Sequence, residues 1–151
     1  MRVWRITHRR YALDKLCADA ALYGGRWNPV GMPALYAGSS IAITAMEKLI
    51  HLGSGTWPPL VLVAVDLPDD AAVYQPEVSA LPACWDALPT STASQTFGGA
   101  WLQRGDTLAM KVPSVIVAEE NNVVINPMHS AYPQVQLSIV RPFTYDRRLV
   151  K

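Results

Sequence analysis

The chain has 151 residues, half of them apolar, which is enough to build the core of one domain over residues 1–151. Thirteen basic and twelve acidic residues give a formal net charge of +1, and basic residues never run longer than two, so no surface for nucleic acid or an anionic membrane is predicted. The sequence also lacks a secretory signal and any run near about 18 apolar residues, which predicts a cytoplasmic location.

The first half of the chain predicts three strands and a helix. Alternating residues favour a strand over residues 2–7 (RVWRIT), and a short apolar segment favours another at 34–38 (ALYAG). A helix is predicted from residue 40 to 52, since a serine can cap its start and Gly53 can end it in a left-handed conformation. Residues 59–68 (PLVLVAVDLP) are nearly continuously apolar, which is typical of a strand buried on both faces.

The second half predicts another helix and three strands. Residues 68–93 are rich in proline and polar residues and are expected to form a loop with short extended pieces. Residues 92–105 (TASQTFGGAWLQRG) favour a helix, although each of its paired glycines costs about 1 kcal/mol relative to alanine. Strands are predicted at 113–119 (PSVIVAE), 122–127 (NVVINP) and 135–143 (VQLSIVRPF). Strands at both ends with helices inserted between them predict an α+β fold with a mixed β-sheet.

Several common catalytic signatures are missing from the sequence. No GxGxxG follows a predicted strand and no GxxxxGK[ST] occurs, which excludes a Rossmann dinucleotide site and a P-loop. The three histidines share no metal-ligand spacing and no carboxylates cluster, so no bound metal is expected. A GxSxG elbow is absent as well. Cys17 and Cys84 form no CxxC pair, and both are interpreted as small core residues.

The candidate functional residues are therefore single polar side chains in apolar surroundings, and Arg26 is the first of them. It follows Gly24 and Gly25, where the backbone can approach a ligand closely, and it precedes Trp27, which can anchor the loop. An arginine so placed suits paired contacts with a phosphate or a carboxylate. A surface arginine in an internal salt bridge is the other interpretation, and both stay open.

Glu47 lies on the predicted helix, at the border between its apolar and polar faces. A carboxylate there can point into a cleft, although periodicity alone favours an ordinary solvated glutamate. Tyr36 lies on the short strand before this helix, so its ring and Glu47 could flank one pocket. A core tyrosine with a hydrogen-bonded hydroxyl is the commoner situation.

Ser114, Asn126 and His129 complete the candidate set. The Ser114 hydroxyl lies among apolar neighbours and needs a partner, which a backbone carbonyl would supply as well as a substrate. Asn126 and His129 share the turn NPMH, where asparagine before proline is expected for conformational reasons alone. Taken singly, His129 favours a structural role.

Two long blocks of sequence resemble the RES domain family in order and spacing: GGRWNPVGMPALYAGSSIAITAMEKLIHL and PSVIVAEENNVVINPMH. The resemblance covers nearly the whole chain. It implies a bacterial toxin of a type II toxin–antitoxin pair, with a fold similar to that of ADP-ribosyltransferases and an activity that consumes NAD⁺ or transfers its ADP-ribose. It also implies a Xre-like helix-turn-helix antitoxin as partner. The family is named for an arginine, a glutamate and a serine, which correspond to Arg26, Glu47 and Ser114.

The resemblance implies a chemical role for each of the polar residues. Glu47 is expected to hold the ribose hydroxyls and to stabilise the positive charge that develops on the ribose as neutral nicotinamide leaves. Arg26 is expected to bind the diphosphate, and Tyr36 to lie against the cationic pyridinium ring. NAD⁺ is then the substrate, and no separate cofactor is expected.

The remaining residues are expected to support this site. Ser114 is expected to orient either the nicotinamide or Glu47 by a hydrogen bond. Arg5, in the WRI segment, is a candidate for a second phosphate contact, and Asn126 and His129 are expected at the rim.

The sequence leaves the acceptor of the ADP-ribose open. Water would make the enzyme an NAD⁺ glycohydrolase, and inorganic phosphate would make it a phosphorylase. A side chain of a host protein would make it an ADP-ribosyltransferase. A module that keeps the fold without catalysis is the remaining alternative.

Overall fold

The computed structural model describes residues 1–149, and its centre is one sheet of seven strands in the order β4-β5-β6-β2-β1-β3-β7. The strands are β1 (Arg2–His8), β2 (Leu35–Gly38), β3 (Leu60–Asp66), β4 (Val73–Tyr74), β5 (Ala109–Pro113), β6 (Asn121–Ile125) and β7 (Gln136–Phe143). The α-helices are α1 (Ala18–Tyr23), α2 (Ile41–Leu52) and α3 (Thr92–Arg104). Short 3₁₀ turns lie at Arg9–Tyr11, Val78–Ala80, Tyr132–Gln134 and Arg147–Leu149. Strands β4 and β5 are parallel and the other neighbours antiparallel, which confirms the α+β fold with a mixed sheet.

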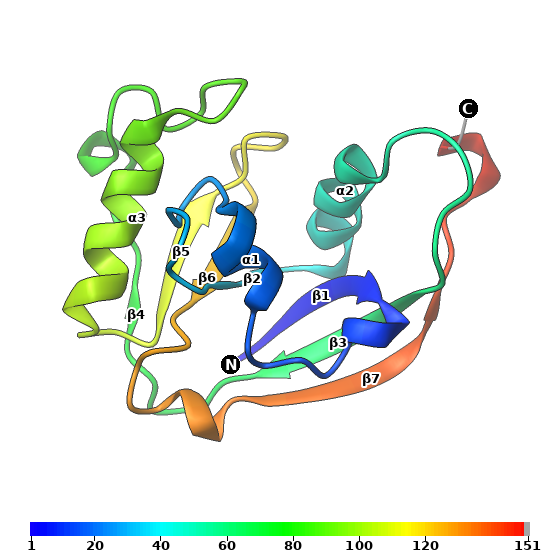
Figure 1. The fold of residues 1–151 in the computed structure, drawn as a ribbon, viewed down its shortest axis with the longest axis horizontal. Coiled ribbons are helices and arrows are strands. Elements are labelled where there is room, and N and C mark those ends of the chain that lie inside the picture. The colour runs from blue at the N-terminus through cyan, green and yellow to red at the C-terminus, as the bar shows by residue number, and fades with distance from the viewer. Residues whose placement is uncertain (150–151) are drawn as a thin grey trace.

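The sheet is nearly divided between β1 and β2. Strand β1 pairs with β3 along its whole length, and β2 pairs with β6 along its whole length. Between β1 and β2, only Trp4 opposite Gly38 is paired. Figure 1 shows the consequence: β4, β5 and β6 run across the direction of β1, β3 and β7, with α3 beside the first group and α2 beside the second. The strands therefore separate on one side of the Trp4–Gly38 pair.

Helices α2 and α3 cover the same face of the sheet. Helix α2 packs against Ile6 and Leu62 on β1 and β3, and α3 packs Trp101 against Met110 on β5. The opposite face carries a separate apolar cluster that includes Val63. Strand β3 is thus buried on both of its faces, as its continuous apolar sequence predicts.

Helix α2 begins and ends where the sequence predicts. The Ser40 hydroxyl accepts a hydrogen bond from the Ile43 amide at 3.2 Å, and Gly53 ends the helix with a φ of 67°. The helix also packs directly onto β2, because a Cβ atom at Gly38 would overlap the Thr44 hydroxyl. Gly38 therefore brings the middle of α2 close to the point where the sheet divides.

The predicted strand at 113–119 is wrong. The strand, β5, lies earlier, at Ala109–Pro113, and residues 114–120 form a turn. The Ser114 hydroxyl accepts hydrogen bonds from the amides of Ile116 and Val117, and the Ser114 amide donates to the Glu120 carbonyl at 2.8 Å. These bonds compete with strand pairing, so the apolar residues after Ser114 are in a turn. The two-residue strand β4 is one of the short extended pieces predicted within residues 68–93, whereas no sequence signal marked α1.

Gly98, inside α3, packs directly against the backbone of Trp27, which leaves no room for a side chain. A Cβ atom there would overlap the backbone carbonyl of Trp27, whereas one at Gly99 would meet only side-chain atoms of Pro29 and Met32, at 3.1 to 3.7 Å. We expect Gly98→Ala to lower the free energy of unfolding by about 2–3 kcal/mol, because backbone cannot give way as a side chain can. Gly99→Ala is the matched control and should change it by less than about 1 kcal/mol. Urea unfolding of both variants checks this, and equal effects would contradict it.

Among the described residues, no helix combines the length and the apolar character needed to cross a membrane.

Candidate functional site

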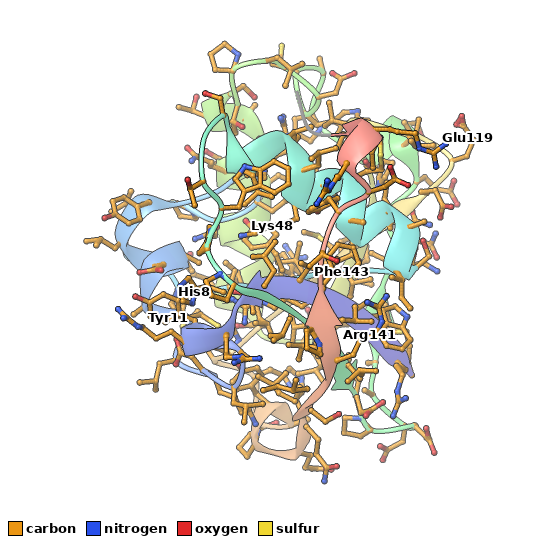
Figure 2. The ribbon with its side chains drawn as sticks, turned by 90° about the vertical axis from the view of Figure 1, so that its right-hand side faces the viewer. His8, Tyr11, Lys48, Glu119, Arg141 and Phe143 are labelled. Carbon is orange, nitrogen blue, oxygen red and sulfur yellow. The ribbon has the colours of Figure 1, made fainter. Side chains whose placement is uncertain are left out.

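A pocket of about 240 Å³ opens where β1 and β2 separate beneath α2. Its walls come from β1, β2, β6 and α2. The lining residues are Arg5, Ile6, Thr7, Tyr36, Ala37, Gly38, Thr44, Glu47, Lys48, His51 and Asn122. Figure 2 shows Lys48 below helix α2, on the side of strand β1. The pocket thus brings together Glu47, Tyr36 and Arg5, three of the residues singled out in the sequence.

The Glu47 carboxylate is held by one of its two oxygens. Its Oε1 accepts a hydrogen bond from the Ser114 hydroxyl at 2.8 Å and another from the Asn122 side-chain amide at 2.7 Å. Within residues 1–149, Oε2 has no hydrogen-bond partner. Glu47 is half-buried and lines the pocket, so it is not the ordinary solvated glutamate that periodicity alone favours.

Ser114 is fully buried and has a fixed hydrogen-bond direction. Its oxygen accepts from the amides of Ile116 at 3.0 Å and Val117 at 3.3 Å. With both acceptor positions used, its single hydroxyl proton is directed to Glu47. The structure therefore places Ser114 as a donor to Glu47, which is one of the two partners the resemblance implies for it.

Tyr36 presents its ring to the pocket, while its hydroxyl is occupied elsewhere. The hydroxyl donates to Asn28 Oδ1 at 2.5 Å and accepts from the Trp27 amide at 3.1 Å. Burial raises the pKa of the Tyr36 hydroxyl above its ordinary value of 10.0. The hydroxyl consequently stays protonated at neutral pH and holds the glycine-rich loop, which leaves the ring as the part that a ligand can contact.

Two cations that form no ion pair within residues 1–149 line the pocket. Burial lowers the pKa of Arg5, and burial together with the nearby Arg5 charge lowers the pKa of Lys48. In the part of the chain that the structure describes, Arg5 Nη1 is buried without a hydrogen-bond partner, and neither cation forms an ion pair. The charges of Asp14 and Asp19 act on Arg5 without forming an ion pair with it, so both cations keep donors that an anionic ligand can use.

Arg26 lies outside the pocket lining and connects two loops. Its Nη1 donates to the carbonyls of Trp85 at 2.8 Å and Ala87 at 3.0 Å. Trp27 stacks on Trp85, with 6.2 Å between ring centroids. The salt bridge considered for Arg26 is not observed in residues 1–149, where its Nε and Nη2 also lack a hydrogen-bond partner. The side chain therefore fixes the loop around Trp85 through Nη1, and Nε and Nη2 remain available as donors to a ligand.

Asn126 and His129 do not lie at the rim of this pocket. Asn126 follows the other end of β6, where its side chain donates to the Leu102 carbonyl at 3.0 Å and accepts from the Met128 amide at 3.0 Å. His129 Nδ1 accepts from the Ala131 amide at 3.0 Å. Both side chains stabilise the turn after β6, which is the conformational role that the NPMH sequence indicates.

Asn122 and Lys48 are site residues that the sequence did not reveal. Asn122 reaches Glu47 because it lies opposite Gly38 in the sheet, a register that no local pattern predicts. Lys48 follows Glu47 on α2 and has the position of a polar surface residue in the helical periodicity. Only the approach of β1 to the helix makes it part of the pocket.

The arrangement offers a half-anchored carboxylate, an aromatic ring face and two cations around one small pocket. A carboxylate can stabilise developing positive charge, a ring face can bind a cationic heterocycle, and cations can hold phosphate. The described residues contain no group of three or more His, Cys, Asp or Glu side chains placed to hold a metal ion.

Comparison with known proteins places the chain in a family. Residues 2–146 match the RES domain. The Prs ADP-ribosylating toxin of Sphingobium sp. is 41% identical over 155 residues, which cover 98% of this chain and 96% of that protein. Toxin Res of Yersinia enterocolitica is 34% identical over 154 residues, 99% of each chain.

A solved structure shares the fold. In the crystal structure of the Mycobacterium tuberculosis MbcT–MbcA toxin–antitoxin complex, one chain matches with a TM-score of 0.70 and 21% identity, covering 98% of this chain and 85% of that one. The resemblance that the sequence indicates is therefore confirmed, and the chain belongs to the RES domain toxin family.

Proposed function

We propose that this toxin cleaves the bond between nicotinamide and ribose in NAD⁺, with Glu47 as its central catalytic residue. The observation that carries the proposal is the half-anchored carboxylate: Ser114 and Asn122 hold Oε1, and Oε2 is left for the substrate. Nicotinamide leaves as a neutral molecule, so the bond breaks without a general acid while positive charge develops on the ribose. A fixed negative charge beside that ribose stabilises the transition state.

The remaining groups of the pocket fit the other parts of NAD⁺. The Tyr36 ring face is available to the cationic pyridinium ring, since its hydroxyl is already bound. Arg5 and Lys48 are available to the diphosphate. A pocket of about 240 Å³ is smaller than a site for a whole dinucleotide, so we infer that it takes the nicotinamide–ribose half and that the adenosine half lies outside it.

Arg26 supports the proposal in a second way. Its Nη1 holds the carbonyls of Trp85 and Ala87, and its Nε and Nη2 have no partner in residues 1–149. A guanidinium can hold a loop on one side and a phosphate on the other, because its donors lie in a rigid plane. We infer that Arg26 fixes the loop around Trp85 and contacts the diphosphate from it.

Lys48→Met should raise the KM for NAD⁺ about tenfold and leave kcat nearly unchanged, because a charge-assisted contact with the diphosphate is lost. Its lowered pKa adds a pH dependence. As pH rises, Lys48 becomes neutral at a lower pH than a lysine with the ordinary pKa of 10.5. The wild-type KM should therefore rise with pH before exposed lysines lose their protons. The KM of the variant should not change over the same pH range. Initial rates at a series of NAD⁺ concentrations and alkaline pH values measure the KM of each enzyme and its pH dependence.

The matched control for this prediction is Lys111→Met on β5, whose side chain does not line the pocket. It should behave as the wild type does. A Lys48→Met enzyme with an unchanged KM would show that Lys48 does not contact the substrate.

ADP-ribosylation of a protein is the second candidate function. It is favoured by one observation, the name of the 41% identical relative from Sphingobium, an ADP-ribosylating toxin. The same carboxylate and the same departing nicotinamide serve both reactions, and only the acceptor differs. Water or phosphate would leave free ADP-ribose or its phosphate, and a protein side chain would retain the label.

NAD⁺ labelled on its adenylate part separates these outcomes. The purified chain is incubated with labelled NAD⁺, with and without phosphate and with a bacterial extract. Free nicotinamide together with unattached labelled ADP-ribose or ADP-ribose phosphate supports NAD⁺ degradation. A labelled protein band supports ADP-ribosylation. Release of no nicotinamide in any mixture would contradict both.

We also propose a Xre-like helix-turn-helix antitoxin as the partner, acting with this chain in the cytoplasm, where NAD⁺ is available. The family assignment and the fold shared with a chain of a toxin–antitoxin complex support an antitoxin partner. Co-expression with a helix-turn-helix gene encoded beside this one should restore growth and give a complex on size-exclusion chromatography, and the absence of such a gene would count against the proposed partner. Growth arrest that persists despite that gene's expression would contradict this partner.

A further inference from the structure

We propose that Asn122 is a positioning residue for Glu47: it anchors the same carboxylate oxygen as Ser114 and so presents the other oxygen to the pocket. This inference rests on the proposed role of Glu47 in catalysis. The Asn122 amide donates to Glu47 Oε1 at 2.7 Å, and the Ser114 hydroxyl donates to it at 2.8 Å.

Two donors achieve what one cannot. A single hydrogen bond from Ser114 leaves the carboxylate free to rotate about that contact, so Oε2 would sample several directions. The second donor comes from a different element, β6, and the two bonds together fix the plane of the carboxylate. Catalysis depends on such fixed geometry, since a displacement of about 1 Å in a reacting group can lower the rate about 100-fold.

Asn122 is itself on a rigid part of the sheet. Its backbone lies opposite Gly38 on β2 and opposite Val112 on β5, so pairing on both sides fixes its position. Its side chain makes one hydrogen bond within the described residues, the one to Glu47. The amide is therefore committed to the carboxylate and does not stabilise another part of the fold.

The two donors restrain Glu47 in a pocket that also carries positive charge. Arg5 on β1 and Lys48 on α2 line the same pocket, together with His51 on α2 and the Tyr36 ring on β2. Asn122 and Ser114 are neutral donors, so they hold the carboxylate in place without adding a further charge to this pocket.

The test begins with Asn122→Ala and its matched control Asn121→Ala. Asn121 is the preceding residue on β6, and its side chain makes no hydrogen bond among residues 1–149 and does not line the pocket. We expect Asn122→Ala to lower kcat for nicotinamide release by about 10- to 100-fold, with KM within about threefold of wild type. Asn121→Ala should match the wild type, and both should unfold at wild-type temperatures.

Asn122→Asp gives a readout that a merely structural role would not change. An aspartic acid can donate to Glu47 only while the two carboxylates share a proton. Its activity relative to wild type should therefore be as low as that of Asn122→Ala at about pH 8.5 and should recover toward about pH 5.5. Asn121→Asp, which adds the same charge without touching Glu47, should show no such recovery.

Growth arrest on expression in bacteria is a second readout, and it can be measured whether or not NAD⁺ is the substrate. Asn122→Ala should lose toxicity while Asn121→Ala keeps it. If the wild type arrests growth without releasing nicotinamide, the proposed function fails and the toxicity comparison still tests Asn122. The positioning role is overturned if Asn122→Ala keeps kcat within about threefold of wild type, if it stays toxic, or if Asn122→Asp shows no recovery at low pH.

Discussion

Glu47→Gln is expected to fold normally and to lose nicotinamide release by about 10³-fold, which corresponds to about 4 kcal/mol of transition-state stabilisation. A glutamine has nearly the same shape, and its amide oxygen can accept the bonds from Ser114 and Asn122 as Oε1 does. The group that then faces the pocket is a neutral amide in place of a charged oxygen. Since positive charge develops on the ribose, loss of that single charge should affect kcat far more than KM.

The matched control is Glu119→Gln. Glu119 is exposed in the turn of residues 114–120 and lies on the surface in Figure 2, so its substitution removes the same charge without reaching the pocket. It should keep wild-type activity. A Glu47→Gln enzyme that retains activity, or one that loses it only because its melting temperature falls below the assay temperature, would contradict the catalytic role of Glu47.

Arg26→Lys is expected to lower kcat/KM by about 100-fold, or about 2.7 kcal/mol. Arg26 uses one nitrogen, Nη1, to hold the carbonyls of Trp85 and Ala87. A lysine ammonium could hold those carbonyls or a phosphate, and it lacks the planar arrangement needed to hold both. Kinetics with NAD⁺ measure the loss, and limited proteolysis of the loop around Trp85 measures whether the loop is released.

Arg104→Lys is the control for this substitution, because Arg104 is an exposed arginine at the end of α3. It should change neither activity nor proteolysis. If Arg26→Lys released the loop but kept wild-type kinetics, Arg26 would be a structural residue alone. If it lowered activity with the loop still protected, the contact with substrate would dominate.

Much of the fold follows from local sequence. Helix α2 carries its own start and stop signals at Ser40 and Gly53, and the continuous apolar run of β3 reflects burial on both faces. The strand predicted at 113–119 failed because a hydroxyl can satisfy backbone amides as well as a neighbouring strand can. The Ser114 bonds to Ile116 and Val117 favour a turn where apolar composition favours a strand.

The site is harder to predict, because its contacts join residues far apart in the chain. Family resemblance pointed to Glu47 and Ser114, and the structure brings them together across 67 positions. Asn122 depends on strand register, and the partners of Arg26 are backbone carbonyls, which have no sequence signature. The sequence singles out Asn126 as a site residue because it is a polar residue in a clear turn motif. In the structure its side chain bonds to the Leu102 carbonyl and the Met128 amide, so it stabilises the backbone around that turn.

The proposed reaction is cleavage of the nicotinamide–ribose bond of NAD⁺ by this chain, with Glu47 as the catalytic residue. The most direct test is to follow purified wild-type and Glu47→Gln protein with NAD⁺ by NMR and to identify each product. The wild type is expected to release one nicotinamide for each NAD⁺ consumed, with the diphosphate intact, and Glu47→Gln is expected to release almost none. Intact NAD⁺ after incubation with the wild type, or cleavage at the diphosphate, would contradict it.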